Sequence, residues 1–269
     1  MIIKTKNFDL KHTLECGQLF RQYKKDGFYF LNVKDKLIRL RQEKSFLHFE
    51  GASRKFIENY FALDEDYEKT INELKKDRHV AKAIEKYNGL RICRQDPWEC
   101  LISYICSAAS NIPKIQRNVN NLGKEFGRKI KLKGRVSYSF PEKSEIKSLC
   151  KINRCGCGFR SKYIFETAKR IDKKWLNSLR KKKYENAKKE LMKLPGVGEK
   201  IADCVLLFSL GFGEAFPVDV WIKRVMEKLY FNNRKTSEKK VREFAQKKWG
   251  KNAGYAQQFL YHLVRNDPN

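Results

Sequence analysis

The chain has 269 residues, 41% of them hydrophobic and 13% aromatic, which is enough to bury the core of one large domain or two smaller ones. Its 59 Lys and Arg against 31 Asp and Glu give a net charge of +28, which favours a polyanionic partner such as nucleic acid, although a generally lysine-rich proteome would give the same bias. No run reaches the roughly 18 apolar residues of a membrane span and the N-terminus lacks a signal-peptide core, so we expect a cytoplasmic protein, nucleoid-associated if bacterial, with reduced cysteines.

Three β-strands are predicted near the N-terminus, at residues 27–33, 36–42 and 45–50. They are rich in aromatic and β-branched residues, and short polar turns separate them. The pair Asp26-Gly27 predicts a hairpin before the first strand. Leu37 and Ile38 break the alternation of the second strand, which leaves its register open. We expect a small antiparallel sheet with flanking helices over residues 1–90.

From about residue 53 the hydrophobic period becomes helical. The start signals include Asp96 before Pro97 and Ser237 before Glu238. Short helices joined by short loops predict a compact bundle over residues 91–269, and with the sheet an α+β fold. The predicted helices cover residues 53–61, 67–76, 79–87, 97–107, 112–126, 161–173, 184–193, 199–210, 220–229, 237–249 and 253–266.

The eight cysteines do not predict a metal site. The sequence CGCG at 155–158 has Cys-x-Cys spacing rather than the paired Cys-x-x-Cys of a zinc ribbon. No cysteine follows Cys204, so a C-terminal four-cysteine iron–sulfur loop is excluded. We therefore expect neither a metal nor a cofactor.

A glycine-rich turn joins two predicted helices within residues 184–210. Gly196, Val197 and Gly198 form this turn, where missing side chains let backbone N–H groups approach an anion closely. Free N–H groups at a helix start suit a phosphate, so the pattern predicts a helix-hairpin-helix that clamps the DNA backbone. An ordinary tight helix–helix turn would give the same local pattern.

Two isolated charges accompany this turn. Lys200 lies at the start of the apolar second helix, where a charge has no obvious structural use. Asp219 follows a proline and precedes the helix predicted at 220–229, where it would also cap the helix.

The segments LPGVGEKIADCV and PVDV resemble the helix-hairpin-helix (HhH-GPD) glycosylase superfamily. In order along the chain, LECGQLFRQ, DPWECLISYICSAASNIPKIQ, CGCGFRSKYI and WGKNAGYAQQFLYH are similar to the 8-oxoguanine DNA glycosylase family. This resemblance implies a sheet domain packed on a helical glycosylase core. It also implies a monomeric base-excision-repair enzyme that removes 8-oxoguanine, and formamidopyrimidine-guanine, from duplex DNA.

The resemblance assigns the catalytic groups. Lys200 is expected to attack the sugar C1′, expel the base and form an imine, which permits β-elimination and a nick 3′ to the lesion. Asp219 is expected to stabilise the positive charge that develops on the sugar.

By the same resemblance, four residues bind the flipped base. The Gly17 carbonyl would accept the N7 hydrogen that distinguishes 8-oxoguanine from guanine. Gln257 would bond the Watson–Crick edge, and Tyr261, four residues further on the same helical face, would stack on the base. Cys204 would face its opposite side.

Further residues are expected to contact DNA. Phe159 resembles the wedge beside the kinked strand, followed by Arg160. Asn111 and Lys114 would contact the opposite strand, together with the hairpin residues already named. Trp221 replaces a histidine of the animal-type enzymes, and its indole N–H can supply a hydrogen bond.

Some of the side chains with which the family contacts the base opposite the lesion are replaced in this sequence. Ala109, Ser110 and Asn111 correspond to a family run of three asparagines, and the Ala109 side chain offers nothing to cytosine. Lys114 replaces an arginine and lacks its bidentate fork. We therefore expect a weaker requirement for cytosine than in the animal-type enzymes.

Two other functions stay open. A monofunctional glycosylase for alkylated bases needs only water and the aspartate, so Lys200 argues against it. A non-catalytic DNA-binding protein would need neither group, whereas this chain has both.

Overall fold

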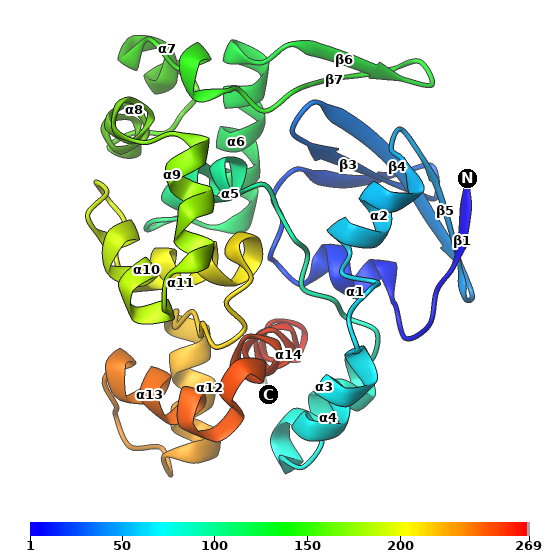
Figure 1. The fold of residues 1–269 in the computed structure, drawn as a ribbon, viewed down its shortest axis with the longest axis vertical. Coiled ribbons are helices and arrows are strands. Elements are labelled where there is room, and N and C mark those ends of the chain that lie inside the picture. Colours follow the sequence, from blue (N-terminus) through cyan, green and yellow to red (C-terminus); the bar gives the residue numbers. More distant parts are fainter. Residues whose placement is uncertain (268–269) are drawn as a thin grey trace.

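The computed structural model describes residues 1–267 and contains a sheet domain packed on a helical core (Figure 1). The predicted α+β fold is confirmed. The sheet is antiparallel with the order β1-β5-β4-β3-β2. Its strands are β1 (Ile2–Lys4), β2 (Gln22–Lys25), β3 (Phe28–Val33), β4 (Lys36–Glu43) and β5 (Phe46–Glu50).

The three predicted strands correspond to β3, β4 and β5. The hairpin at Asp26-Gly27 is present, with φ values of 50° and 76° that match a type I′ turn and pair Lys25 with Phe28. Leu37 and Ile38 are both buried, at 4% and 0% exposed, so both faces of β4 are covered at that point. This explains the broken alternation in the sequence.

The helices follow the predicted order, with short additions. The sheet part carries α1 (Leu10–Glu15), α2 (Arg54–Tyr60), α3 (Tyr67–Leu74) and α4 (Arg78–Tyr87). The remaining helices are α5 (Pro97–Ile105), α6 (Ile112–Phe126), α7 (Leu149–Arg154), α8 (Arg160–Arg170), α9 (Lys173–Ser178), α10 (Tyr184–Met192), α11 (Glu199–Val205), α12 (Val220–Tyr230), α13 (Glu238–Trp249) and α14 (Ala253–Asn266). A two-stranded hairpin of β6 (Lys129–Leu132) and β7 (Arg135–Tyr138) extends from the core beside the sheet (Figure 1).

Most predicted helix boundaries lie within two residues of the observed ones, and the largest difference is in the helix predicted at 161–173. The helix predicted at 161–173 ends at Arg170, because Ile171 is extended and Asp172 caps α9 by accepting from the Trp175 N–H at 2.8 Å. The helix predicted at 199–210 changes from α to a π-helical turn (Leu206–Leu210) and stops at Gly211, which has a left-handed φ of 84°.

Two hydrophobic cores support these parts. One lies between the sheet, α1 and α2, and includes Ile38, Leu47 and Phe61. The larger one fills the helical region and also takes in side chains of α3 and α4. The helices α3 and α4 precede residue 90 but pack into the helical core. The domain boundary proposed at residue 90 stays a prediction.

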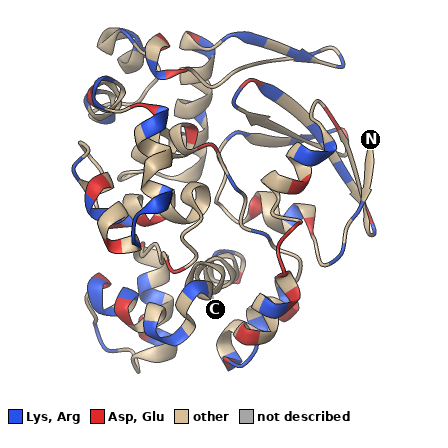
Figure 2. Ribbon diagram, viewed as in Figure 1, with Lys and Arg blue, Asp and Glu red and all other residues tan. Residues whose placement is uncertain are grey.

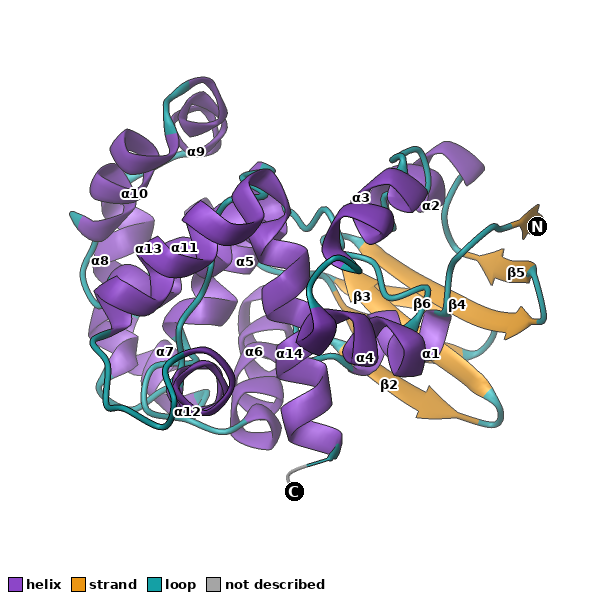
Figure 3. Cartoon of the chain, turned by 90° about the horizontal axis from the view of Figure 1, so that it is seen from below, coloured by secondary structure: helices purple, strands orange, loops and turns teal. Residues whose placement is uncertain are grey.

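The helix α14 runs between the two parts, as the view from below shows (Figure 3). It packs against α4 on one side and α12 on the other. No helix within residues 1–267 is long and apolar enough to cross a membrane.

Candidate active site

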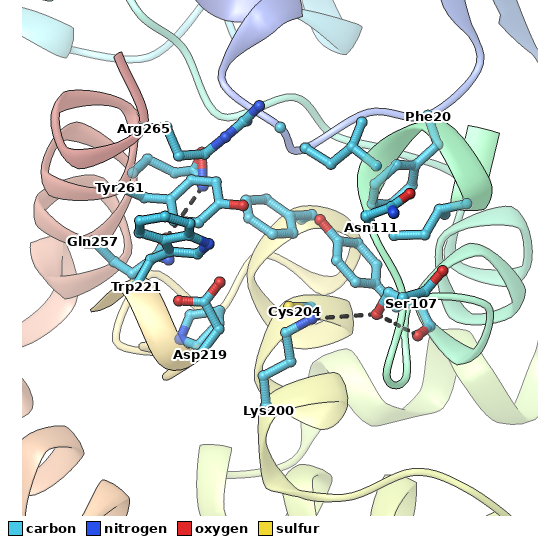
Figure 4. Close-up of a pocket in the computed structure, with 18 of the residues that line it drawn as sticks. Phe20, Ser107, Asn111, Lys200, Cys204, Asp219, Trp221, Gln257, Tyr261 and Arg265 are labelled. Carbon is cyan, nitrogen blue, oxygen red and sulfur yellow. Dashed lines mark hydrogen bonds between the residues drawn. The ribbon is translucent and has the colours of Figure 1, made fainter. Parts of the chain in front are cut away.

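A cavity of about 350 Å³ lies where the segment after α1, the end of α5, α11, α12 and α14 meet. Its volume suits a small aromatic ligand such as a nucleobase. The cavity brings together Gly17, Asn111, Lys200, Cys204, Asp219, Trp221, Gln257 and Tyr261, all of which the sequence predicted (Figure 4). The other predicted residues, Phe159, Arg160, Lys114, Gly196, Val197 and Gly198, do not line it.

The hairpin turn places Lys200 at the cavity. Gly196 has a φ of 74°, and a Cβ built there would lie 2.3 Å from the Tyr163 ring, so only glycine fits the turn. Val197 is buried and fixes the turn to the core. Gly198 caps α11 without a side-chain hydrogen bond, which leaves the N–H groups of the first turn without a side-chain acceptor.

A buried ionic network holds the hairpin against α13. Asp203 is 0% exposed, and its carboxylate accepts from Arg242 Nε at 2.7 Å, Lys188 Nζ at 3.2 Å and the Tyr184 hydroxyl at 2.6 Å. Arg242 also bonds Glu199 at 2.6 Å. Because Glu199 and Asp203 flank Lys200 on α11, this network fixes the helix that carries the amine.

The half-buried Lys200 side chain ends beside Ser107. Its Nζ lies 3.2 Å from Ser107 Oγ, while that hydroxyl donates its proton to the Tyr104 carbonyl at 2.7 Å. Since a hydroxyl has one proton, Ser107 can only accept from Lys200. The amine therefore points an N–H at Ser107, and its remaining positions are left for the cavity (Figure 4).

Asp219 stands at the N-terminus of α12, on the opposite side of the cavity mouth from Ser107 (Figure 4). Its side chain accepts from the Ile222 N–H at 2.8 Å, so the capping role predicted from the sequence is present. Burial raises the pKa of Asp219, and the Ile222 N–H and the Lys200 charge oppose that rise. The cap holds the carboxylate in place while leaving it on the cavity wall.

The base-binding candidates form the rest of the wall. Gln257 is buried, and its amide oxygen accepts from Gln258 Nε2 at 3.2 Å, so its N–H donors remain for a ligand. Tyr261 lies one turn further along α14, and both side chains face the cavity (Figure 4). Cys204 is buried one turn after Lys200, and burial raises the pKa of its thiol to about 12, which keeps it protonated at neutral pH.

Gly17 is held by its neighbour Gln18. The Gln18 side chain is 0% exposed, donates to the Arg91 carbonyl at 2.7 Å and accepts from the Cys93 N–H at 2.8 Å. Gly17 itself has a φ of 86°, and within residues 1–267 its carbonyl has no hydrogen-bond donor. The Gly17 carbonyl is thus a fixed, free acceptor beside the cavity.

The predicted wedge is exposed, whereas its neighbour is buried. Phe159 is 57% exposed, but Arg160 is 2% exposed, and its guanidinium donates to the carbonyls of Ala108, Ala109 and Cys157. Arg160 thereby supports the loop that follows α5 from behind. Its direct contact with DNA stays a prediction.

The loop that would face the opposite strand is strained at one residue. Ala109 has a left-handed φ of 45°, an uncommon conformation for a non-glycine residue. Asn111 caps α6 by accepting from the Lys114 N–H at 3.0 Å, and both residues are exposed. Trp221 is 43% exposed at the cavity edge.

Ser107 and Arg265 are among the cavity residues that the sequence did not predict as site residues. Ser107 lies 93 positions from Lys200, and no spacing pattern links them. Arg265 follows Tyr261 at the same interval of four that separates Tyr261 from Gln257, so an extended helical stripe could have identified it.

Among residues 1–267, no three His, Cys, Asp or Glu side chains cluster as metal ligands would. The chemistry that the described residues support is nucleophilic attack by an amine beside a carboxylate. Lys and Arg occur along both the sheet part and the helical part, with Asp and Glu interspersed among them (Figure 2).

A glycine-rich hairpin with a lysine and an aspartate on one nucleobase-sized cavity defines a helix-hairpin-helix DNA glycosylase. The model described as 8-oxoguanine DNA glycosylase, N-terminal domain, matches residues 1–101, and that described as HhH-GPD superfamily base excision DNA repair protein matches residues 102–251. The chain belongs to the 8-oxoguanine DNA glycosylase family, and the resemblance seen in the sequence is confirmed.

Named relatives and solved structures agree with this assignment. An N-glycosylase/DNA lyase of Saccharomyces cerevisiae is 32% identical over 94% of this chain and 82% of its own length. An N-glycosylase/DNA lyase of Arabidopsis thaliana is 32% identical over 93% of this chain and 75% of its own. The Clostridium acetobutylicum 8-oxoguanine glycosylase/lyase, solved with duplex DNA containing cytosine opposite 8-oxoguanine, superimposes with a TM-score of 0.93 and 32% identity, covering 100% of this chain and 99% of that one.

Proposed function

We propose that this protein excises 8-oxoguanine from duplex DNA and then cleaves the abasic strand, with Lys200 as the nucleophile. The observation that carries the proposal is the placement of Lys200 and Asp219 on one cavity with Gln257 and Tyr261. The names of the yeast and Arabidopsis relatives and of the Clostridium enzyme support the reaction class. The oxidised lesion formamidopyrimidine-guanine presents a similar edge and is proposed as a second substrate.

The first step is binding with base flipping. The hairpin N–H groups and the basic surface hold phosphates, which positions the duplex without reading its sequence. Phe159, which is exposed and lies 6.0 Å from the Tyr163 ring between ring centres, fills the gap left in the stack. The extruded base enters the cavity, where Tyr261 and Cys204 contact its two faces and Gln257 donates to its Watson–Crick edge.

The Gly17 carbonyl supplies the selection against guanine. 8-Oxoguanine has a hydrogen on N7, which this acceptor can bind, whereas guanine presents a lone pair there and is repelled. Because Gln18 fixes the position of Gly17 through buried hydrogen bonds, the acceptor cannot move away from the unfavourable contact.

The chemical step joins Lys200 to the sugar. The neutral amine attacks C1′, a C1′–Nζ bond forms, and the C1′–N9 bond breaks with its electron pair leaving on the base, which takes up a proton. Asp219, as a carboxylate, stabilises the positive charge that the sugar develops during this exchange. Ring opening then gives an imine between C1′ and Nζ, a C2′ proton is lost, and the C3′–O bond breaks to nick the strand 3′ to the lesion.

Borohydride trapping tests the proposal. With an 8-oxoguanine:C duplex we expect a covalent protein–DNA band for the native protein and none for Lys200→Gln, because reduction captures only an imine. Base release without a trapped band would indicate a monofunctional glycosylase. Tight duplex binding without release or trapping would leave only a DNA-binding protein.

The same gels test the opposite-base preference. Ala109 has no polar side chain with which to recognise cytosine. We therefore expect lesion pairs with A, G or T to be cleaved less than about a hundredfold more slowly than the C pair, since a hundredfold is the upper range for the loss of one base contact. A larger preference for cytosine would show that another side chain reads it.

A further inference from the structure

The cavity contains one positive charge with no assigned part in the reaction. Arg265 lies on α14 and lines the cavity with Gly17, Tyr261 and Gln257. Its guanidinium carbon is 5.4 Å from the centre of the Tyr261 ring, and within residues 1–267 it has no hydrogen-bond or ion-pair partner. Figure 4 shows Arg265 extending from α14 over Tyr261, away from Lys200 and Asp219.

Arg265 and Gly17 are direct neighbours. A Cβ built on Gly17 would lie 2.6 Å from Arg265 Nη1 and 3.0 Å from Tyr261 Cε1. The guanidinium therefore lies immediately beside Gly17 and close to the Tyr261 ring. Its N–H donors and the Gly17 carbonyl acceptor form one polar edge of the cavity.

This edge matches the chemistry of the oxidised purine. In 8-oxoguanine the N7 hydrogen stands between two carbonyl oxygens, O6 and O8, so that edge reads acceptor, donor, acceptor. Gly17 can satisfy the central donor only, since a carbonyl repels both flanking oxygens. A guanidinium beside it supplies N–H groups for one of them, and a planar fork of donors is the group best suited to a carbonyl edge.

We propose that Arg265 is a specificity-determining residue that donates a hydrogen bond to a carbonyl oxygen flanking N7 of the flipped 8-oxoguanine. This inference rests on the proposed function. The cation also offsets the electrostatic repulsion between the Gly17 carbonyl and the purine oxygen next to N7. Binding of the base thus depends on Arg265, whereas later attack on an abasic sugar does not.

Single-turnover kinetics of Arg265→Leu separate these steps. We expect excision of 8-oxoguanine to slow by about ten- to hundredfold, the range for one hydrogen bond to a base, while β-elimination at a preformed abasic site stays within about twofold. Arg224→Leu is the matched control for the loss of one exposed charge near the site, since Arg224 lies beside the Trp221 ring, 6.0 Å from its centre. It should affect both substrates equally.

Duplex binding in the Lys200→Gln background identifies the oxygen. If Arg265 donates to O8, Arg265→Leu weakens binding of 8-oxoguanine and 8-oxoadenine duplexes alike. If it donates to O6, only the 8-oxoguanine duplex is affected, because adenine carries an amino group there. Both results support the proposal.

Other results overturn it. Equal losses on the lesion and the abasic duplex, with unchanged melting temperature, would make Arg265 a backbone-binding residue, and unchanged excision would remove it from recognition. Native protein that fails to excise 8-oxoguanine would instead reject the proposed function, so the two failures are distinguishable.

Discussion

The hydroxyl of Ser107 controls how the Lys200 amine is presented. Because its proton is committed to the Tyr104 carbonyl, it accepts an N–H from Lys200 and never competes for the lone pair of the neutral amine. An amine held in this way directs its lone pair toward the cavity, where C1′ must arrive. In the proposed mechanism, Ser107 would therefore orient the amine of Lys200.

Replacing Ser107 should slow the chemistry selectively. We expect Ser107→Ala to lower the single-turnover excision rate about tenfold, as for loss of one hydrogen bond, with little change in duplex affinity. Ser107→Thr keeps the hydroxyl and should restore most of the rate. A parallel loss in Ala and Thr variants, or weaker duplex binding that explains the slower rate, would contradict this role.

The predictability of single residues depended on their neighbours in the chain. Lys200, Asp219, Gln257 and Tyr261 stand in recognisable segments, so the sequence alone predicted residues that the structure brings together on one cavity. Ser107 could not be found in this way, since only the packing of α5 against α11 brings it to Lys200. The burial of Arg160 was likewise hidden, because two of its three carbonyl partners, Ala109 and Ala108, lie 51 and 52 residues away.

At the scale of elements, α14 joins recognition to stability. The same helix carries Gln257 and Tyr261 toward the cavity and buries His262 on its other side, 4.3 Å from the Tyr87 ring of α4 between ring centres. Burial, with the charges of His12, Arg265 and Lys11, lowers the pKa of His262 to about 4. The helix therefore packs properly only with a neutral imidazole.

This burial makes stability fall on acidification. Unfolded histidine binds a proton below about pH 6.5, whereas folded His262 resists until about pH 4, so the stabilisation is complete above pH 6.5 and is lost as pH falls toward 4. Between pH 7 and 4.5 this group should remove about 2.5 kcal/mol from the free energy of unfolding.

Urea unfolding at both pH values, compared with His262→Gln, measures the effect. The variant should be less stable at pH 7 but should lose about 2.5 kcal/mol less between the two pH values. If the free energy of unfolding changed equally with pH in both proteins, protonation of His262 would not destabilise the folded state.

The elements that the sequence missed are short. β1 and β2 have three and four residues, and α1 and α7 have six each, which is too few to produce a clear period. The break at Ile171 was missed because apolar residues continue through Trp175 and Leu176 in the next helix. Longer helices such as α6 and α14 were predicted at their observed bounds, since their apolar stripes are long.

At the scale of the whole molecule, charge predicts how binding responds to salt. A net charge of +28 spread over both parts suits contacts with the phosphate backbone. With about four phosphates contacted, the duplex dissociation constant should rise roughly a hundredfold between 50 and 200 mM salt. Fluorescence anisotropy with lesion and undamaged duplexes should give parallel slopes, because these charges do not read the base. If the dissociation constant did not change with salt, or changed only for the lesion duplex, contacts in the cavity rather than with the phosphate backbone would dominate binding.

The assembly of the whole molecule was the least predictable level. The fold class followed from strands preceding helices, but α14 packs against α4, a segment more than a hundred residues earlier in the chain, as well as against the nearer α12. Those contacts help to form the cavity, so its shape emerged only in three dimensions.

The anchoring of the loop after α5 by Arg160 has a kinetic consequence for the search along DNA. One guanidinium fastens that loop to the segment bearing Phe159, so both probing surfaces exist before any encounter and neither must become ordered on contact. Binding free energy that would otherwise be needed to order a loop is then available to bend the duplex, whose stiffness varies with base pairing and stacking. If Phe159 and this loop probe the duplex as proposed, we expect the time spent on each stretch of DNA to depend on how easily that stretch bends.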